Sequence, residues 1–188
     1  MCNLLALTGC KKPTPGVSVR GKIIAATKVA TMPKTEKQIG VAAGGNYTPE
    51  LGDGVRYGEA FGLVSGAKWV DMEFVVASGE LSAQLIGENG FKSFQNELMG
   101  KFVGTNDAVR EFVEELNDCC GGWIIAIPTL DDPTVAAIVG STDSPCAFDM
   151  PKMTTAKKAG EESSAEVKFT DLSGKIWRSY PIALGLPV

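Results

Sequence analysis

The stretch TNDAVREFVEELNDCCGGWIIAIPTLDDPTVAAIVGS, residues 105–141, decides the fold. In its first part, four apolar side chains at i, i+3, i+4 and i+7 give an α-helix a single apolar stripe. Thr105 or Asn106 can cap the start of this helix, and Gly121-Gly122 can end it without strain. We therefore predict an amphipathic helix over about 106–118. Its stripe consists of Val109, Phe112, Val113 and Leu116.

The rest of this stretch predicts a β-hairpin. WIIAIPTL (123–130) and VAAIVGS (135–141) are apolar runs of strand length, and the turn residues Asp131-Asp132-Pro133-Thr134 separate them. Because the helix directly precedes this pair, we expect it to cover one face of the hairpin.

Further strands are predicted on both sides of this stretch. The clearest is 70–76, where apolar and polar residues alternate. After the turn Ser78-Gly79-Glu80, the same pattern at Leu81, Ala83 and Leu85 predicts its partner strand. A first strand is expected within 17–30, bent near Gly21, and closing strands at 165–172 and 175–184, joined across Ser173-Gly174. At 91–104 the pattern allows a helix as well as a strand, and we favour strand or irregular structure.

This order of elements predicts a β-rich α+β fold. We expect a two-sheet β-sandwich or barrel with one flanking amphipathic helix and an extended N-terminal arm or loop. The 188 residues divide into an arm at 1–15 and a single β-rich domain at 16–188. Inside the domain, 33–66 is a long glycine-rich excursion with weak strand content. Loops of this length are usually functional or ordered by a partner, so the excursion indicates assembly.

Charge is distributed unevenly along the chain. Residues 1–34 carry +6 without an acidic residue, and the remainder therefore carries −10, because the whole chain carries −4. A basic segment on an acidic body can dock on an acidic neighbour, including a second copy, or it can simply be a solvated terminus. The acidic body argues against broad nucleic-acid binding.

The usual residues of hydrolytic catalysis are missing. The chain has no histidine, which excludes a Ser-His-Asp mechanism for Ser65, Ser78 or Ser141. Asp131-Asp132 is better explained by the turn than as a carboxylate pair. Cys119-Cys120 is better explained as small packing residues than as a redox site. The five cysteines lack the spacing of a secreted disulfide framework, so we expect free thiols in a reducing compartment.

Metal, phosphate and ligand-cage sites are also not predicted. Cys2 and Cys10 have neither Cys-x-x-Cys nor histidine spacing. Gly44-Gly45-Asn46 and Gly52-Asp53-Gly54 lack the strand–loop–helix context of a phosphate-binding loop. We therefore predict no catalytic, cofactor-binding or metal-ligating residue, no cofactor and no enzymatic activity. The three tryptophans are expected in the core or on a sheet face: Trp69, Trp123 and Trp177.

The first residues leave one alternative open. Leu7-Thr8-Gly9-Cys10 has the form of a bacterial lipoprotein cleavage box, in which Cys10 would be acylated. No basic residue precedes the apolar run, and the run itself spans only Asn3 to Gly9, which is short for a signal peptide. No stretch approaches the ~20 apolar residues of a membrane span.

Five segments carry a resemblance to a known family. They are DMEFVVASGELSAQL (71–85), AVREFVEEL (108–116), WIIAIPTLDDPTVAAIVGS (123–141), AKKAGEESSA (156–165) and EVKFTDL (166–172). Over about 70–184 the chain resembles the tail tube (major tail) proteins of tailed bacteriophages. The resemblance implies a β-sandwich or barrel with one flanking helix. It also implies hexameric rings that stack into a tube, with sheet edges, long loops and terminal arms bridging between subunits.

The resemblance supplies the functional expectation. It implies a non-enzymatic, self-assembling virion protein in the phage tail, assembled in the host cytoplasm, with a channel that conducts DNA without sequence-specific binding. The expected partners are further copies of the chain and other virion proteins, and no membrane. An acidic channel wall would repel DNA phosphates. The alternatives are a head–tail connector, a capsid decoration protein, or a bacterial lipoprotein or binding module anchored through Cys10; an unrecognised enzyme ranks after these.

Overall fold

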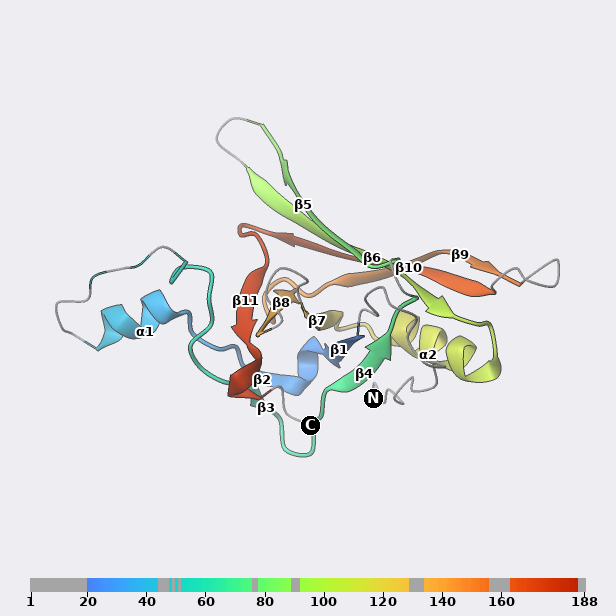
Figure 1. Cartoon of the computed structure of the whole chain (residues 1–188), viewed down its shortest axis with the longest axis horizontal. Helices are drawn as coiled ribbons and strands as arrows, with labels where there is room; N and C mark the ends of the chain where they lie inside the picture. The colour runs from blue at the N-terminus through green and yellow to red at the C-terminus, as the bar shows by residue number, and fades with distance from the viewer. Residues whose placement is uncertain are drawn as a thin grey trace.

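Two antiparallel sheets pack face to face in the computed structural model (Figure 1). The model describes residues 20–43, 48, 50, 52–75, 78–88, 92–128, 134–155 and 163–185. The predicted β-rich α+β sandwich is confirmed, and the sheets do not close into a barrel.

The strands are numbered in chain order. The five-stranded sheet has the spatial order β11 (Arg178–Pro181), β8 (Val135–Val139), β7 (Trp123–Pro128), β1 (Arg20–Ala25) and β4 (Val70–Glu73). The four-stranded sheet has the order β5 (Glu80–Ile86), β6 (Ser93–Val103), β10 (Ser164–Ser173) and β9 (Ala147–Thr154). The remaining elements are the small sheet β2 (Val29–Thr31) with β3 (Gly62–Leu63), the helices α1 (Glu36–Ala42) and α2 (Asp107–Asp118), and the 3-10 turns η1 (Ala26–Lys28) and η2 (Ile182–Leu184).

The main core lies between the two sheets and α2. The predicted helix is confirmed, and its four stripe residues are all buried. The Asn106 side chain caps its start by accepting a hydrogen bond from the Val109 N–H at 3.0 Å. At its other end, the indole N–H of Trp123 donates to the Leu116 carbonyl at 3.0 Å. This bond ties the helix to β7, so the helix backs the β7–β8 hairpin as expected.

The β7–β8 hairpin is also confirmed. The two strands pair antiparallel from Ile125 opposite Val139 to Pro128 opposite Ala136. Nearly every residue of both strands is buried, which explains the continuous apolar runs, because each face of this sheet is covered. The predicted turn at Asp131-Asp132-Pro133 lies outside the described residues.

The 33–66 excursion packs back on its own chain. Its Tyr57 and Phe61 side chains, with Trp69, fill a second core on the far face of the five-stranded sheet. The sequence prediction missed α1 inside this excursion, although Thr35 and Gln38 form a reciprocal capping box there. α1 buries none of its side chains and lies at the end of the molecule opposite α2 (Figure 1).

The partner predicted for the strand at 81–85 was wrong. β4 pairs with β1 in the five-stranded sheet, whereas β5 pairs with β6 in the other sheet. The chain crosses between the sheets directly after β4. There, Phe74 bridges to Phe102, and the Val75 N–H donates to the Lys101 carbonyl at 2.7 Å.

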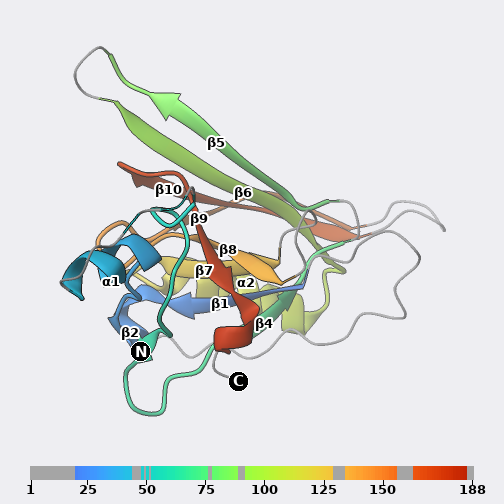
Figure 2. The same cartoon turned by 60° about the vertical axis from the view of Figure 1, so that its left-hand side comes forward.

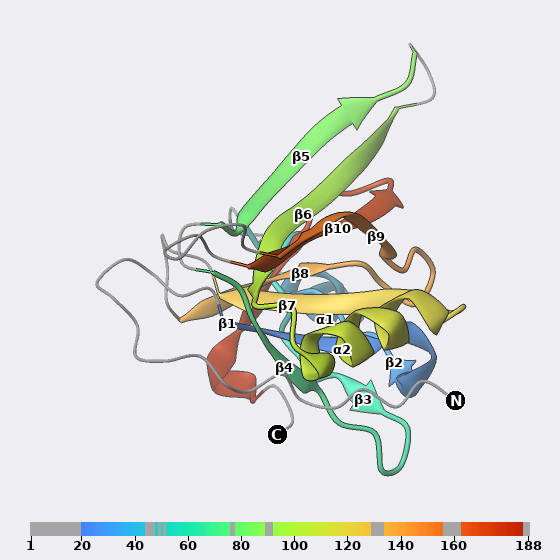
Figure 3. The same cartoon turned by 90° about the vertical axis from the view of Figure 1, so that its right-hand side faces the viewer.

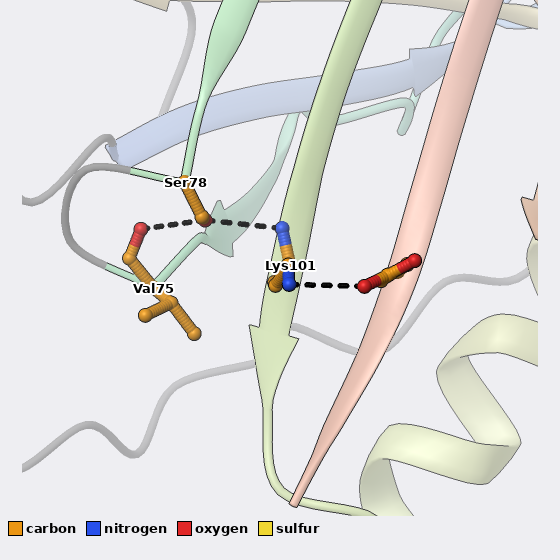
Figure 4. Close-up of polar contacts among 4 residues, drawn as sticks. Val75, Ser78 and Lys101 are labelled. Atoms are coloured by element: carbon orange, nitrogen blue, oxygen red, sulfur yellow. Dashed lines mark hydrogen bonds and ion pairs between the residues drawn. The ribbon is translucent and has the colours of Figure 1, made fainter. Parts of the chain in front are cut away.

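Ser78 fixes the far side of this crossing (Figure 4). Its hydroxyl donates to the Val75 carbonyl at 2.7 Å and accepts from the Lys101 N–H at 3.1 Å. The turn predicted at Ser78-Gly79-Glu80 is not formed by these residues, because Glu80 already begins β5, and the connection redirects the chain to a new sheet instead of closing a hairpin.

The remaining strands follow the prediction in part. Residues 93–103 form β6, which settles the choice between strand and irregular structure. β1 contains Gly21, and β10 and β11 are the two closing strands, in different sheets. β9 was not predicted.

Truncating the helix stripe should be costly. Phe112 is 2% exposed and its ring stands edge-on to Phe102 at 5.4 Å between centroids. We expect Phe112→Ala or Leu116→Ala to lower the free energy of unfolding by about 2–5 kcal/mol each, measured by urea denaturation. The exposed neighbour change Glu111→Ala should stay within about 0.5 kcal/mol. A loss below about 1 kcal/mol at Phe112 would contradict this packing.

The crossing should tolerate no side chain at Gly100. A Cβ on Gly100 would lie 2.5 Å from a ring carbon of the buried Phe74, which is itself stacked on Phe102. We expect Gly100→Ala to destabilise the protein by about 1–3 kcal/mol. Gly174→Ala is the matched control, because nothing lies within 4 Å of its Cβ position. Equal unfolding midpoints for the two variants would show that Phe74 can move aside.

Candidate functional site

The most distinctive surface feature is the hairpin of β5 and β6, which extends away from the rest of the protein (Figure 2 and Figure 3). The two strands keep an unbroken antiparallel register from Glu80 opposite Met99 to Ile86 opposite Ser93. None of the seven β5 residues is buried, and Leu85 is 50% exposed. The hairpin therefore carries apolar side chains that its own body does not cover.

A buried polar cluster braces the base of this hairpin. Asn96 on β6 lies opposite Asp171 on β10, and its amide donates to the Asp171 carboxylate at 3.1 Å and to the Lys175 carbonyl at 3.1 Å. The Ser144 hydroxyl donates to the other Asp171 oxygen at 2.5 Å. These bonds join β6, β10 and the β8–β9 loop, so the hairpin leaves the body from a fixed base.

Three of the four outer sheet edges are protected against pairing with another strand. Beyond β11, the segment Val55–Tyr57 already occupies the edge, with the Tyr57 N–H donating to the Ser179 carbonyl at 2.8 Å. β4 is short and carries the charged residues Asp71 and Glu73. β9 contains Pro151, which has no N–H, and its register against β10 shifts. Proline, charge, short length and irregular register are the common protections of sheet edges.

Among the described edges, β5 has the fewest of these protections, because its one charged residue is Glu80 at its first position. From Leu81 to Ile86 it reads LSAQLI, without proline or charge, and its register is regular. A regular, uncharged edge strand presents unpaired backbone N–H and C=O groups to any partner strand. The free edge of β5 is therefore the candidate site, and it offers backbone groups to which a further strand could pair.

A cavity of about 220 Å³ lies beside the polar cluster. Asp143 and Asp171 line it, but Lys175 and Arg178 line it as well, so the charges balance. The Arg178 guanidinium donates to the Gly54 carbonyl and lies 6.0 Å from the Tyr57 ring centroid. Burial raises the pKa of Tyr57, and the positive charge of Arg178 partly opposes this rise. A phenol held protonated in this way does not serve as a base at neutral pH.

The structure brings three of the cysteines to one cavity of about 350 Å³, which Cys119, Cys120 and Cys146 line. Cys119 is buried, as expected for a packing residue, but it is disulfide-bonded, so the expectation of free thiols was wrong for it. Cys120 and Cys146 are free thiols, the first exposed and the second buried. Burial raises the pKa of Cys146 well above its ordinary value.

The remaining residues considered for chemistry do not converge. Ser65 is exposed, and the Ser141 hydroxyl accepts a hydrogen bond from the Ser144 N–H at 3.0 Å inside its own loop. Gly52-Asp53-Gly54 is a turn followed by Val55. Within the described ranges no three histidine, cysteine or acidic side chains gather as a metal site would require. Several other candidates lie outside the described residues: Cys2, Cys10, Gly44-Gly45-Asn46 and Asp131-Asp132.

The tryptophans lie where the sequence placed them. Trp69 and Trp123 are buried in the two cores, and Trp177 is half-buried against the main core. The exposed edge of β5 was not among the sequence-predicted sites. Its signal was present in the uncharged run at 81–86, but an edge is recognisable only once the strand order is known.

Comparisons with family models, curated proteins and solved structures find no match for this chain. In the part of the chain that the structure describes, no helix has the length and apolar character needed to cross a membrane. The functional conclusion therefore depends on the geometry above and on the resemblance in the sequence.

The two free thiols should differ strongly in reactivity. The buried Cys146 thiol, whose pKa is raised, is protonated and inaccessible, whereas the exposed Cys120 thiol is open to reagents. Under non-reducing conditions near neutral pH, we expect iodoacetamide to label Cys120 and to leave Cys146 unlabelled until urea unfolds the protein. Peptide mass mapping of the Cys120→Ser variant isolates Cys146. Native labelling of Cys146 at the rate of Cys120 would show that its site is open.

Proposed function

We propose that this protein is a non-enzymatic, self-assembling structural subunit of a virion, and that it is a tail tube subunit of a tailed bacteriophage. The observation that carries the proposal is the unprotected β5 edge on a projecting, braced hairpin. The resemblance over about 70–184 supplies the choice of a tail tube among the assemblies that such an edge supports.

The occupant proposed for this edge is a second copy of the chain. Strand addition satisfies the open backbone groups of β5 and gives affinity through main-chain hydrogen bonds. The uncovered Leu85 and the half-buried Phe94 lie opposite each other on the same face of the hairpin, so a neighbour would bury them together. When one edge pairs with a different surface of the next copy, the contact is heterologous, and repetition gives a ring or a helical filament.

The two sheets differ in a way that suits a channel wall. Tyr57, Phe61 and Trp69 cover the outer face of the five-stranded sheet. The outer face of the four-stranded sheet is uncovered and mixed: on β6 and β10 its outward positions include Gln95 and Lys101 beside the exposed apolar side chains Met99 and Leu172. In the proposed ring, a segment of the next copy adds beside β5, and the outer face of this second sheet lines the channel through which DNA passes.

Charges placed on β5 should abolish assembly without unfolding the subunit. Gln84 and Leu85 are exposed and point to opposite faces of the strand. Lysines on an edge strand oppose strand addition. We expect the double variant Gln84→Lys, Leu85→Lys to remain a single chain at concentrations where the unmodified protein forms rings or tubes of constant width. Light scattering and negative-stain electron microscopy over a concentration series measure this.

The matched control adds the same two charges elsewhere. Ala108 and Asn117 are exposed on α2, so Ala108→Lys with Asn117→Lys should assemble like the unmodified protein. Both variants should keep the unmodified thermal midpoint. The proposal fails if the unmodified protein remains monomeric at every concentration, or if the β5 variant assembles as well as the α2 control. Closed rings without tubes would favour a head–tail connector instead.

A further inference from the structure

The cavity of about 220 Å³ beside the polar cluster is lined by opposite charges that do not pair with each other. Asp171 at the end of β10 and Asp143 in the β8–β9 loop are its acidic residues, and Lys175 and Arg178, in and after the β10–β11 connection, are its basic residues. Among the described residues, none of these four side chains has an opposite charge within 4.0 Å. All four can therefore pair with a ligand.

Asp171 is the most deeply buried of these charges, at 4% exposure. Its carboxylate accepts hydrogen bonds from the Asn96 amide at 3.1 Å and from the Ser144 hydroxyl at 2.5 Å. Because a carboxylate has about four acceptor sites, about half of its capacity remains open. A buried anion without a counter-charge is unfavourable, so this end of the cavity favours a cation.

The polar cluster also lacks a hydrogen-bond donor. Asn96 is 1% exposed, and its amide nitrogen donates both to Asp171 and to the Lys175 carbonyl. Its amide oxygen is buried without a hydrogen-bond partner in the part of the chain that the structure describes. Turning the amide over would place this oxygen against two acceptors, so the present orientation is the better one. An ammonium group carries a positive charge and three donors, which are the two things that the cluster lacks.

The basic residues of the cavity are held in place by other contacts. The Lys175 N–H donates to the Ser173 hydroxyl at 3.0 Å, and the same hydroxyl donates to the Lys175 carbonyl at 2.7 Å. The Arg178 guanidinium donates to the Gly54 carbonyl and lies 6.0 Å from the Tyr57 ring centroid. A guanidinium has five N–H donors, so Arg178 keeps donors for an anion after this contact. The basic residues therefore favour a carboxylate.

The size of the cavity limits the ligand. Pockets for drug-sized molecules measure about 300–1,000 Å³, and this cavity is smaller. Ile138, Ile176 and Trp177 add apolar surface to its lining. The cavity therefore suits a short hydrocarbon chain with a charged group at each end.

We propose that this cavity binds a compact zwitterion, a small molecule with one ammonium group and one carboxylate. The ammonium group pairs with Asp171, and the carboxylate pairs with Lys175 and Arg178. Short amino acids have this chemistry. The site uses neither the β5 edge nor a second copy of the chain, so the inference does not depend on the proposed function.

A set of five probes distinguishes a zwitterion from a single charge. Glycine, β-alanine and 4-aminobutyrate differ in the number of methylene groups between ammonium and carboxylate. Ethylammonium carries the cation alone, and propionate carries the anion alone. We expect at least one of the three amino acids to bind the full-length chain at least about tenfold more tightly than either single-charge probe, because it makes one more charge-assisted contact. Ligand-observed NMR titration measures these affinities.

Variants at the two ends of the cavity test the assigned roles. Asp171→Asn keeps the side-chain size, and we expect it to weaken binding of the preferred amino acid at least about tenfold. Lys175→Gln should also weaken binding of the amino acid, but it should not weaken binding of ethylammonium. Asp149→Asn and Lys152→Gln are the matched controls, because both residues are exposed on β9 and lie outside the cavity lining.

The outcome does not depend on the buried variant. Lys175 is exposed, so Lys175→Gln should keep the unmodified thermal midpoint even if Asp171→Asn lowers it. The inference is overturned if none of the three amino acids binds, or if ethylammonium or propionate binds as tightly as the best of them. It is also overturned if Lys175→Gln binds that amino acid as tightly as Lys152→Gln does.

Discussion

The crossing of the chain between its two sheets is the constraint on which the rest of the structure depends. Phe74 leaves one sheet, bridges to Phe102 in the other and stacks on its ring at 5.3 Å, in space that Gly100 leaves open. Without this crossing, the strand at 80–86 would fold back on β4 as a local hairpin. With it, β5 becomes the outer strand of the second sheet, and its free edge faces outward.

The free edge of β5 keeps a defined direction because hydrogen bonds hold the base of the hairpin. Asn96 and Asp171 form a buried polar pair where the hairpin leaves the sandwich, and Ser144 adds a tie from the β8–β9 loop. A buried carboxylate with such partners holds the two strands in one arrangement, because a displaced strand would leave it without its hydrogen bonds. The same cluster that ends the apolar core therefore fixes the direction in which β5 presents its edge.

The sequence predicted what depends on neighbours along the chain and missed what depends on distant ones. Helix periodicity and the apolar runs of β7 and β8 are local patterns, and both were right. The pairing of β5 is set by Phe74 meeting Phe102 across the core, which no local pattern contains. α1 is short and has no apolar stripe, but the spacing of Thr35 and Gln38 could have predicted its capping box. β9 is largely exposed and includes Pro151, so neither alternation nor propensity marked it as a strand.

The charge distribution shows the same limit of sequence-based prediction most clearly. Counting along the sequence separates a basic first segment from an acidic body, yet Arg20 and Lys22 lie in β1, paired with Glu73 and Asp71 of β4. Part of the basic first segment is therefore an interior strand whose charge is already compensated. On the second sheet, compensation is again pairwise, by register. Which surface charges remain uncompensated is therefore set by the strand register, and a count of charges along the sequence does not reveal it.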